Sequence, residues 1–106
     1  MGKEEDKVMK LIKKFKNDIS KKINIERLIL FGSRASGTAK KTSDIDLLLI
    51  SKDFSGEKYY KRPPELYLLW KYDYDIDLLC LTPAELKKKE KQIGIIKEAV
   101  NKGILI

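Results

Sequence analysis

The chain has 106 residues, of which 23 are basic and 16 acidic, giving a formal net charge of +7, and it contains no histidine and one cysteine, Cys80. The missing histidines exclude Ser-His and Cys-His catalysis and zinc sites that need imidazole, and a lone cysteine excludes an internal disulfide framework. The length predicts a single domain, residues 1–106, with no room for a second substrate domain. The lysine-rich charge would attract polyanions, although a solvated surface is the simpler interpretation.

The N-terminal segment and the lengths of the apolar runs indicate the cellular compartment of the protein. The N-terminal segment is charged from Lys3 onward and has no apolar signal core, and no stretch approaches the length of a membrane span. A single cysteine inside an apolar run suits a reducing compartment. We therefore expect a cytoplasmic protein with no membrane partner.

The first half of the chain alternates between helical and extended patterns. Apolar residues recur at helical spacing in the first segment, at Val8, Leu11, Ile12, Phe15, Ile19 and Ile23, which predicts an amphipathic helix with a core-facing stripe. Residues from about 26 to 32 and from about 44 to 51 are predicted to form the first two strands. The loop between them contains Gly37 and the pair Lys40-Lys41.

The second half adds helices and a third strand. Pro63-Pro64 would begin a helix, and residues from about Tyr74 to Leu81 form the third predicted strand. Thr82-Pro83-Ala84-Glu85 has capping-box spacing, so a last helix should begin there, bend at Gly94 and end at Gly103. The tail Ile104-Leu105-Ile106 would add an edge strand or pack on a neighbour. This order predicts an α+β (two-layer α/β) fold, a small mixed sheet with helices packed on one face.

Two polar motifs stand at the strand ends. An apolar run ends at Gly32-Ser33, where a backbone without a Cβ can turn and present N–H groups and a hydroxyl to an anion. Asp44 and Asp46 open the second strand, where residues i and i+2 point to the same face. Two carboxylates at that distance repel one another, and a divalent metal is the simplest partner that would hold them together.

A third carboxylate stands in the third predicted strand. Asp77 is surrounded by Ile76 and residues 78–81, all apolar, and a buried, unpaired carboxylate there would cost several kcal/mol. Asp75 shares its strand face and is the alternative third acid. A salt-bridge network with Arg34 or Lys40 is the structural alternative to a metal site. A Walker loop is excluded, because Thr38 follows Gly37 where that motif requires lysine.

Gly32-Ser33 followed after a loop by Asp44-x-Asp46 resembles the signature of the DNA polymerase β-like nucleotidyltransferase superfamily, specifically its minimal, palm-only members of the MNT type. The resemblance implies that Gly32 and Ser33 hold the triphosphate of a nucleoside triphosphate. It also implies that the catalytic acids Asp44 and Asp46 bind two Mg²⁺ ions, or Mn²⁺, with Asp77 as the best candidate for the acid that completes the metal site. Arg34 is expected to contact phosphate or to stabilise the loop. Ser36 stands where family members often carry a second basic residue.

The resemblance implies metal-dependent transfer of a nucleoside monophosphate to an acceptor, with release of pyrophosphate. Neither the acceptor nor the preferred base can be predicted from the sequence. The alternative is an antitoxin-like partner of a small helical (HEPN-type) toxin, acting by binding or by nucleotide attachment. A basic nucleic-acid-binding module is a further, less favoured interpretation, and a homo-oligomer is compatible with the apolar tail.

Overall fold

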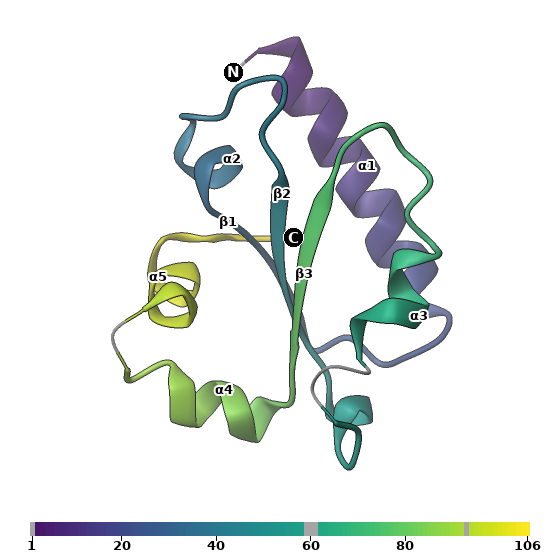
Figure 1. Ribbon diagram of the computed structural model, residues 1–106, viewed down its shortest axis with the longest axis vertical. Helices are drawn as coiled ribbons and strands as arrows, with labels where there is room; N and C mark the ends of the chain where they lie inside the picture. The colour runs from purple at the N-terminus through teal and green to yellow at the C-terminus, as the bar shows by residue number, and fades with distance from the viewer. Residues whose placement is uncertain (1, 59–61, 93) are drawn as a thin grey trace.

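The computed structural model describes residues 2–58, 62–92 and 94–106 and is shown in Figure 1. Its elements run in the order α1 (Lys3–Ser20), β1 (Arg27–Phe31), α2 (Ser33–Ser36), β2 (Ile45–Ile50), the 3-10 helix η1 (Lys52–Phe54), α3 (Pro63–Tyr67), β3 (Ile76–Leu81), α4 (Pro83–Lys89), α5 (Ile95–Lys102) and β4 (Ile104–Leu105). None of the helices in these described ranges combines the length and the apolar character needed to cross a bilayer.

The four strands form one mixed sheet in the order β3-β2-β1-β4. β1 is antiparallel to both β2 and β4, whereas β2 and β3 are parallel. The predicted α+β fold with a mixed sheet is therefore confirmed. Of the two alternatives for the C-terminal tail, an edge strand or packing on a neighbour, the structure shows the edge strand. That strand pairs Leu30 with Ile104 and Ile29 with Leu105.

One face of the sheet is covered by α1 and α3. The apolar stripe of α1 packs against the alternate strand residues that include Leu28, Leu47 and Cys80. Phe15 of this stripe meets Trp70 edge to face, with the ring centroids 5.1 Å apart. The stripe is thus the core-facing side of α1, as its spacing predicts.

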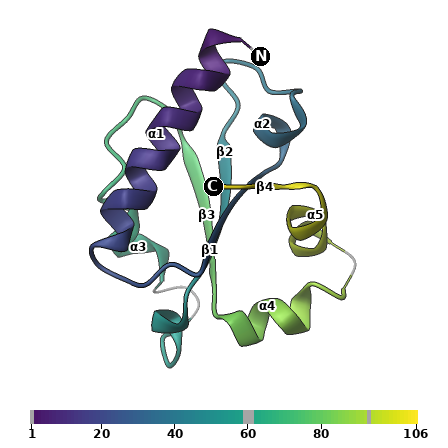
Figure 2. The same cartoon turned by 180° about the vertical axis from the view of Figure 1, so that it is seen from behind.

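The other face is covered by α4 and α5, so the prediction of helices on one face only is wrong (Figures 1 and 2). The second layer of helices is explained by β2, whose residues 47–50 are all buried. A strand that is apolar on both faces of the sheet needs helices packed on both faces. Leu86 of α4 and Ala99 of α5 supply that cover over Ile29 and Leu48.

The last predicted helix is in fact two. The capping box at Thr82–Glu85 begins α4 as predicted, with the Thr82 side chain accepting from the Glu85 backbone N–H. Gly94 does not bend a continuous helix: it precedes α5 with a φ of +147°, outside the helical region. The break lets both short helices pack on the same face of the sheet.

Candidate functional site

Gly32 makes the turn from β1 into α2. Its φ of +75° is in the region that favours glycine, and its carbonyl accepts hydrogen bonds from the N–H groups of Ala35 and Ser36, both at 3.1 Å. A Cβ at this position would overlap Oδ2 of Asp46 and lie 3.3 Å from its Cγ. Gly32 is therefore needed both for its backbone conformation and for the space that the Asp46 carboxylate takes.

The strand register brings Asp46 and Asp77 together. They are paired positions of the parallel strands β2 and β3, so their side chains leave the same face of the sheet on backbones about 4.8 Å apart. Asp44 precedes β2 by one residue and has the same parity as Asp46, so the extended chain directs it to the same face. This is the face that α4 and α5 cover further along the strands.

Asp46 is the electrostatic centre of this group. Its pKa is raised from the ordinary value of 3.8, first by burial, then by the negative charge of Asp77 and then by that of Asp44. Each of these carboxylates disfavours the ionised form of Asp46. Asp44 and Asp77 therefore both lie close enough to Asp46 to interact with it electrostatically.

The donor set of the site suits a hard divalent cation. All three candidate ligands are carboxylates, which Mg²⁺ and Mn²⁺ prefer, and a cation would relieve the repulsion that raises the pKa of Asp46. Within the described ranges no three acidic, cysteine or histidine side chains already form a cage for a metal ion. The carboxylates fit a cation by chemistry and position but would have to adjust their rotamers around it.

Asp77 belongs to the candidate site because of its strand register and not because it is buried. The expectation of a buried carboxylate is wrong, because Asp77 is exposed at the second position of β3. Its register with Asp46 and its effect on the pKa of Asp46 connect it to the site. Asp75 is also exposed, and its backbone carbonyl accepts from the Ile45 N–H at 2.8 Å, which extends the β2–β3 pairing.

Arg34 is turned towards the loop that leads into Asp44. Its guanidinium donates to the Ser43 carbonyl, with Nη2 at 2.8 Å and Nε at 3.1 Å, and Nη2 lies 3.3 Å from the carbonyls of Lys40 and Lys41. It also lies 5.1 Å from the centroid of the Tyr74 ring. Of the two roles expected for Arg34, these contacts support stabilisation of the loop.

The salt-bridge alternative for the acids has no support in the described ranges. The ion pairs found there are Lys52–Glu26 and Arg62–Glu85. Neither Arg34 nor Lys40 is paired with Asp44, Asp46 or Asp77 in this part of the chain. The carboxylate group is thus not explained as one half of a lysine–arginine network.

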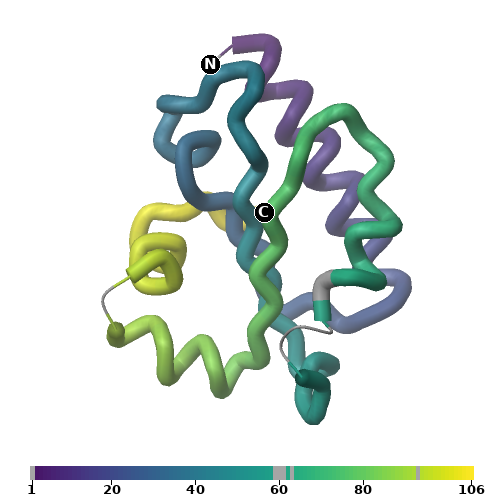
Figure 3. The backbone as a smooth tube through the Cα atoms, viewed as in Figure 1, coloured from purple at the N-terminus to yellow at the C-terminus, as the bar shows by residue number. Residues whose placement is uncertain are grey.

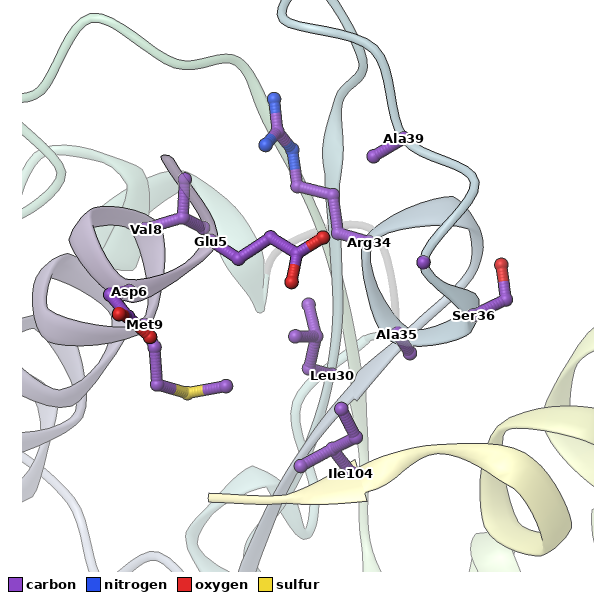
Figure 4. A pocket seen from close by; sticks show the side chains of 11 residues that line it. Glu5, Asp6, Val8, Met9, Leu30, Arg34, Ala35, Ser36, Ala39 and Ile104 are labelled. Atoms are coloured by element: carbon purple, nitrogen blue, oxygen red, sulfur yellow. The ribbon is translucent and has the colours of Figure 1, made fainter. Parts of the chain in front are cut away.

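Two cavities lie beside the Gly32 turn on opposite faces of the sheet. The larger, of about 330 Å³, lies between α1 and α2, with Leu30 and Ile104 in its wall and Glu5 and Arg34 at its side (Figure 4). Leu30 faces α1, so this cavity is separated by the sheet from Asp46 and Asp77. The smaller, of about 50 Å³, lies on the carboxylate face between Gly32 and α5.

Residues of α5 near Gly32 were not foreseen from the sequence. Glu98 and Lys102 line the smaller cavity together with Gly32 and Ser36. No short-range pattern could have indicated this, because α5 and the Gly32 turn are distant in sequence and meet only through the packing of α5 on the sheet. In Figure 3 the yellow-green coil of α5 lies next to the blue coil of α2, the short helix that follows Gly32.

Comparison with known proteins places this geometry in a family. A family model described as "Nucleotidyltransferase domain" matches residues 12–74. A protein of Methanocaldococcus jannaschii named "Putative protein adenylyltransferase" is 32% identical over 99 residues, which are 92% of this chain and 96% of that protein. The family match includes Gly32, Ser33, Asp44 and Asp46, whereas Asp77 lies beyond it.

Two solved structures share the fold. A structure titled as a "putative nucleotidyltransferase" from Sulfolobus solfataricus superposes with a TM-score of 0.73 and 24% identity, covering 99% of this chain and 87% of that one. A chain from a structure titled as a toxin–antitoxin with AMP-PNP has a TM-score of 0.50 and 22% identity, covering 95% of this chain and 70% of that one. With the family model covering more than half of the chain, these results show that it belongs to the nucleotidyltransferase domain family and is an enzyme of that class.

Proposed function

We propose that this chain transfers a nucleoside monophosphate from a nucleoside triphosphate to a protein acceptor, with release of pyrophosphate, in a reaction that needs Mg²⁺ or Mn²⁺. The observation that carries the proposal is the position of Asp46, which lies over the Gly32 turn and in register with Asp77. A carboxylate so placed joins the part of the site suited to phosphates to the part suited to a cation.

Asp44 and Asp46 are the proposed principal metal ligands, with Asp77 as the third. When bound, the metal neutralises phosphate charge and makes the attacking hydroxyl more acidic. Asp46 is half-buried and lies near two other carboxylates, so a bound cation would stabilise its ionised form more than that of the other two acids. Asp77 is exposed to solvent, and we assign to it the role of taking the proton of an incoming hydroxyl.

Gly32 and Ser33 are the proposed phosphate-binding residues. Gly32 lets the chain turn sharply beside Asp46, and Ser33 is the first residue of α2, directly after the turn. Arg34 acts indirectly in this proposal, because its hydrogen bonds fix the loop 40–43 that precedes Asp44. We therefore assign to Arg34 the positioning of Asp44, and to Gly32 and Ser33 the contacts with the nucleotide.

The comparison with the archaeal relative supports a protein as the acceptor and ATP as the donor. That relative, 32% identical, is named as a putative protein adenylyltransferase. We propose the cytoplasm as the location, because the free, buried Cys80 suits a reducing compartment that also contains ATP and Mg²⁺.

A second role, as the binding partner of a small helical toxin protein, is favoured by exposed apolar residues. Ile95 of α5 is 62% exposed, and Leu105 of the edge strand β4 is 65% exposed. Side chains of this kind stabilise contacts with another chain when they are covered. An antitoxin that attaches a nucleotide to its partner would unite this role with the first, and the same surface is compatible with a homo-oligomer.

The test is transfer of label from ATP in the presence of Mg²⁺ and a cell extract. Label on the α-phosphate should become attached to protein, whereas label on the γ-phosphate should leave with pyrophosphate. Asp46→Asn should abolish the transfer, and Asp73→Asn, which changes an exposed acid outside the site, should not. Transfer of the γ-label, or full activity of Asp46→Asn, would contradict the proposal.

A further inference from the structure

We propose that Lys102 is a further phosphate-binding residue, which supplies positive charge to the terminal phosphates of the nucleotide from the last turn of α5. This inference rests on the proposed function, because it assumes that the triphosphate lies at the Gly32-Ser33 turn. It adds a residue from the far end of the chain, outside the matched family region at residues 12–74.

The small cavity at the turn places Lys102 in the site. Its volume is about 50 Å³, and its lining residues come from two segments, the turn itself and α5; they are Phe31, Gly32, Ala35, Ser36, Glu98, Lys102 and Gly103. Phe31 packs with the core on the α4–α5 side of the sheet, and Asp46 is its register partner in β2. The cavity therefore adjoins the carboxylates on their own face.

The backbone beside Lys102 is held firmly against β1. A Cβ at Gly103 would overlap the Ala99 carbonyl oxygen and Cγ2 of Ile29, and it would lie 3.0 Å from the Leu30 carbonyl oxygen. The chain then enters β4, whose Ile104 pairs with Leu30. Because Leu30 stands two residues before Gly32, this contact fixes the end of α5 next to the phosphate turn.

The cation of the turn itself, Arg34, is engaged elsewhere. Arg34 points to the carbonyls of the loop 40–43. The Ser36 hydroxyl lies 3.2 Å from the Ser33 carbonyl and 2.8 Å from the Thr38 hydroxyl. Lys102 is exposed and forms no ion pair within the described ranges, so its ammonium is available to an anion.

Glu98 is the opposing charge in the same cavity. It lies one turn before Lys102 on α5 and is also exposed. A pairing of Glu98 with Lys102 would give the lysine a structural role instead. The ion pairs found in the described part of the chain do not include these two residues, and the ammonium of a lysine is a good point-charge ligand for phosphate.

The size of the cavity limits what it would hold. About 50 Å³ is enough for phosphate oxygens or one or two waters but not for a nucleobase. With Lys102 assigned to the terminal phosphates, the inference predicts an effect on the β- and γ-phosphates and none on the base. The affinity for ATP should depend on Lys102, and the affinity for AMP should not.

The experiment measures the dissociation constants of ATP and AMP, with Mg²⁺ present, by calorimetry on the whole chain. Lys102→Gln should weaken ATP binding roughly 10-fold, as expected for loss of one charge-assisted hydrogen bond, and leave AMP binding unchanged. Lys97→Gln is the matched control, because it removes an exposed lysine of α5 that lines a different part of the surface. In the Lys102→Gln background, Ser36→Arg should restore ATP binding, since residue 36 lines the same cavity.

The outcomes separate this inference from the proposed function. Unchanged ATP binding by Lys102→Gln overturns the inference alone, and so does equal weakening by Lys97→Gln, which would indicate general attraction by charge. A wild-type chain that binds no ATP with Mg²⁺ overturns the proposed function and the inference with it. Glu98→Gln tests whether Glu98 and Lys102 form a structural ion pair. If Glu98→Gln and Lys102→Gln both lower the melting temperature, and by the same amount, the two residues form a stabilising pair and the inference is wrong.

Discussion

The carboxylate of Asp46 occupies the space that a side chain on Gly32 would need. A Cβ built on Gly32 would overlap Oδ2 of Asp46, so the phosphate turn at the end of β1 and the acid at the start of β2 are fitted to one another. β1 and β2 are antiparallel neighbours, and Asp46 is the register partner of Phe31, which precedes Gly32. The spacing between the two motifs thus reflects direct contact in the sheet.

Replacing Gly32 by alanine should damage both stability and the site. The backbone must keep a φ of +75° with a ψ of −154°, a combination open mainly to glycine that costs an L-residue about 1–3 kcal/mol, and Asp46 must move away from the added methyl. We expect a loss of about 2–3 kcal/mol in the free energy of unfolding, measured in urea, together with loss of Mg²⁺-dependent ATP binding.

Gly56→Ala is the matched control for this prediction. Gly56 has a similar φ of +84°, but a Cβ there would meet nothing within 4 Å. It should show the backbone cost alone and leave ATP binding intact. Loss of ATP binding in Gly56→Ala as large as that in Gly32→Ala would mean that the contact between residue 32 and Asp46 does not determine binding.

The raised pKa of Asp46 predicts how stability responds to pH without metal. Because the folded state holds the Asp46 proton more tightly than the unfolded state does, this group favours folding at low pH. Its contribution is lost as the pH rises from the ordinary value of 3.8 through the raised pKa of the folded protein. Asp46→Asn should therefore raise the melting temperature of the chain at neutral pH in EDTA.

The same pair of proteins tests the role of a cation. Mg²⁺ should stabilise the wild-type chain and have a much smaller effect on Asp46→Asn, as binding to the folded state alone requires. Melting curves of both proteins at several pH values, with EDTA and with Mg²⁺, would check this. An Asp46→Asn chain that is less stable than wild type at neutral pH in EDTA would contradict the electrostatic account.

Arg34→Lys should loosen the loop before Asp44 even though it keeps the charge. Lysine cannot reproduce the contacts that Nε and Nη2 make with the Ser43 carbonyl. We expect a loss of about 1–2 kcal/mol in stability and faster amide hydrogen exchange in residues 40–43. Arg27→Lys, at an exposed position in β1, is the control. An undisturbed loop would show that these hydrogen bonds do not hold it.

Arg62 should contribute far more to stability than a surface lysine. It is 6% exposed, donates to the Cys80 and Glu57 carbonyls, and pairs with Glu85, whose pKa is lowered chiefly by its hydrogen bond with Arg62. Arg62→Met should cost about 3 kcal/mol. Lys52→Met, which breaks a pair whose side chains are 78% and 39% exposed, should cost less than about 1 kcal/mol. Urea denaturation of the two variants would compare them directly.

The parts of the fold that depend on local pattern could be predicted from the sequence. The stripe of α1, the capping box of α4 and the glycine turn at residue 32 each follow from spacing or from a single backbone requirement. The second helical layer was missed because strand residues 47–50 are apolar in both directions, and an unbroken apolar run does not say how many layers cover it.

The site shows the same division between local and long-range information. Asp44 and Asp46 are neighbours in sequence, so their shared face follows from strand periodicity. The apolar neighbours of Asp77 predict a buried carboxylate, but Asp77 is exposed, and it is the β2–β3 register that connects it to the site. Lys102 could not be found from sequence, because its position depends on how α5 packs and on the close approach of Gly103 to β1.

The most direct test of the central claim is the affinity of the chain for ATP with and without Mg²⁺, measured for wild type, Asp46→Asn and Asp73→Asn. If Asp46 joins the phosphate turn to a metal site, wild type and Asp73→Asn will bind ATP much more tightly with Mg²⁺ than in EDTA, and Asp46→Asn will lose that difference. An Asp46→Asn chain that binds ATP with wild-type affinity and the same dependence on Mg²⁺ would contradict the account.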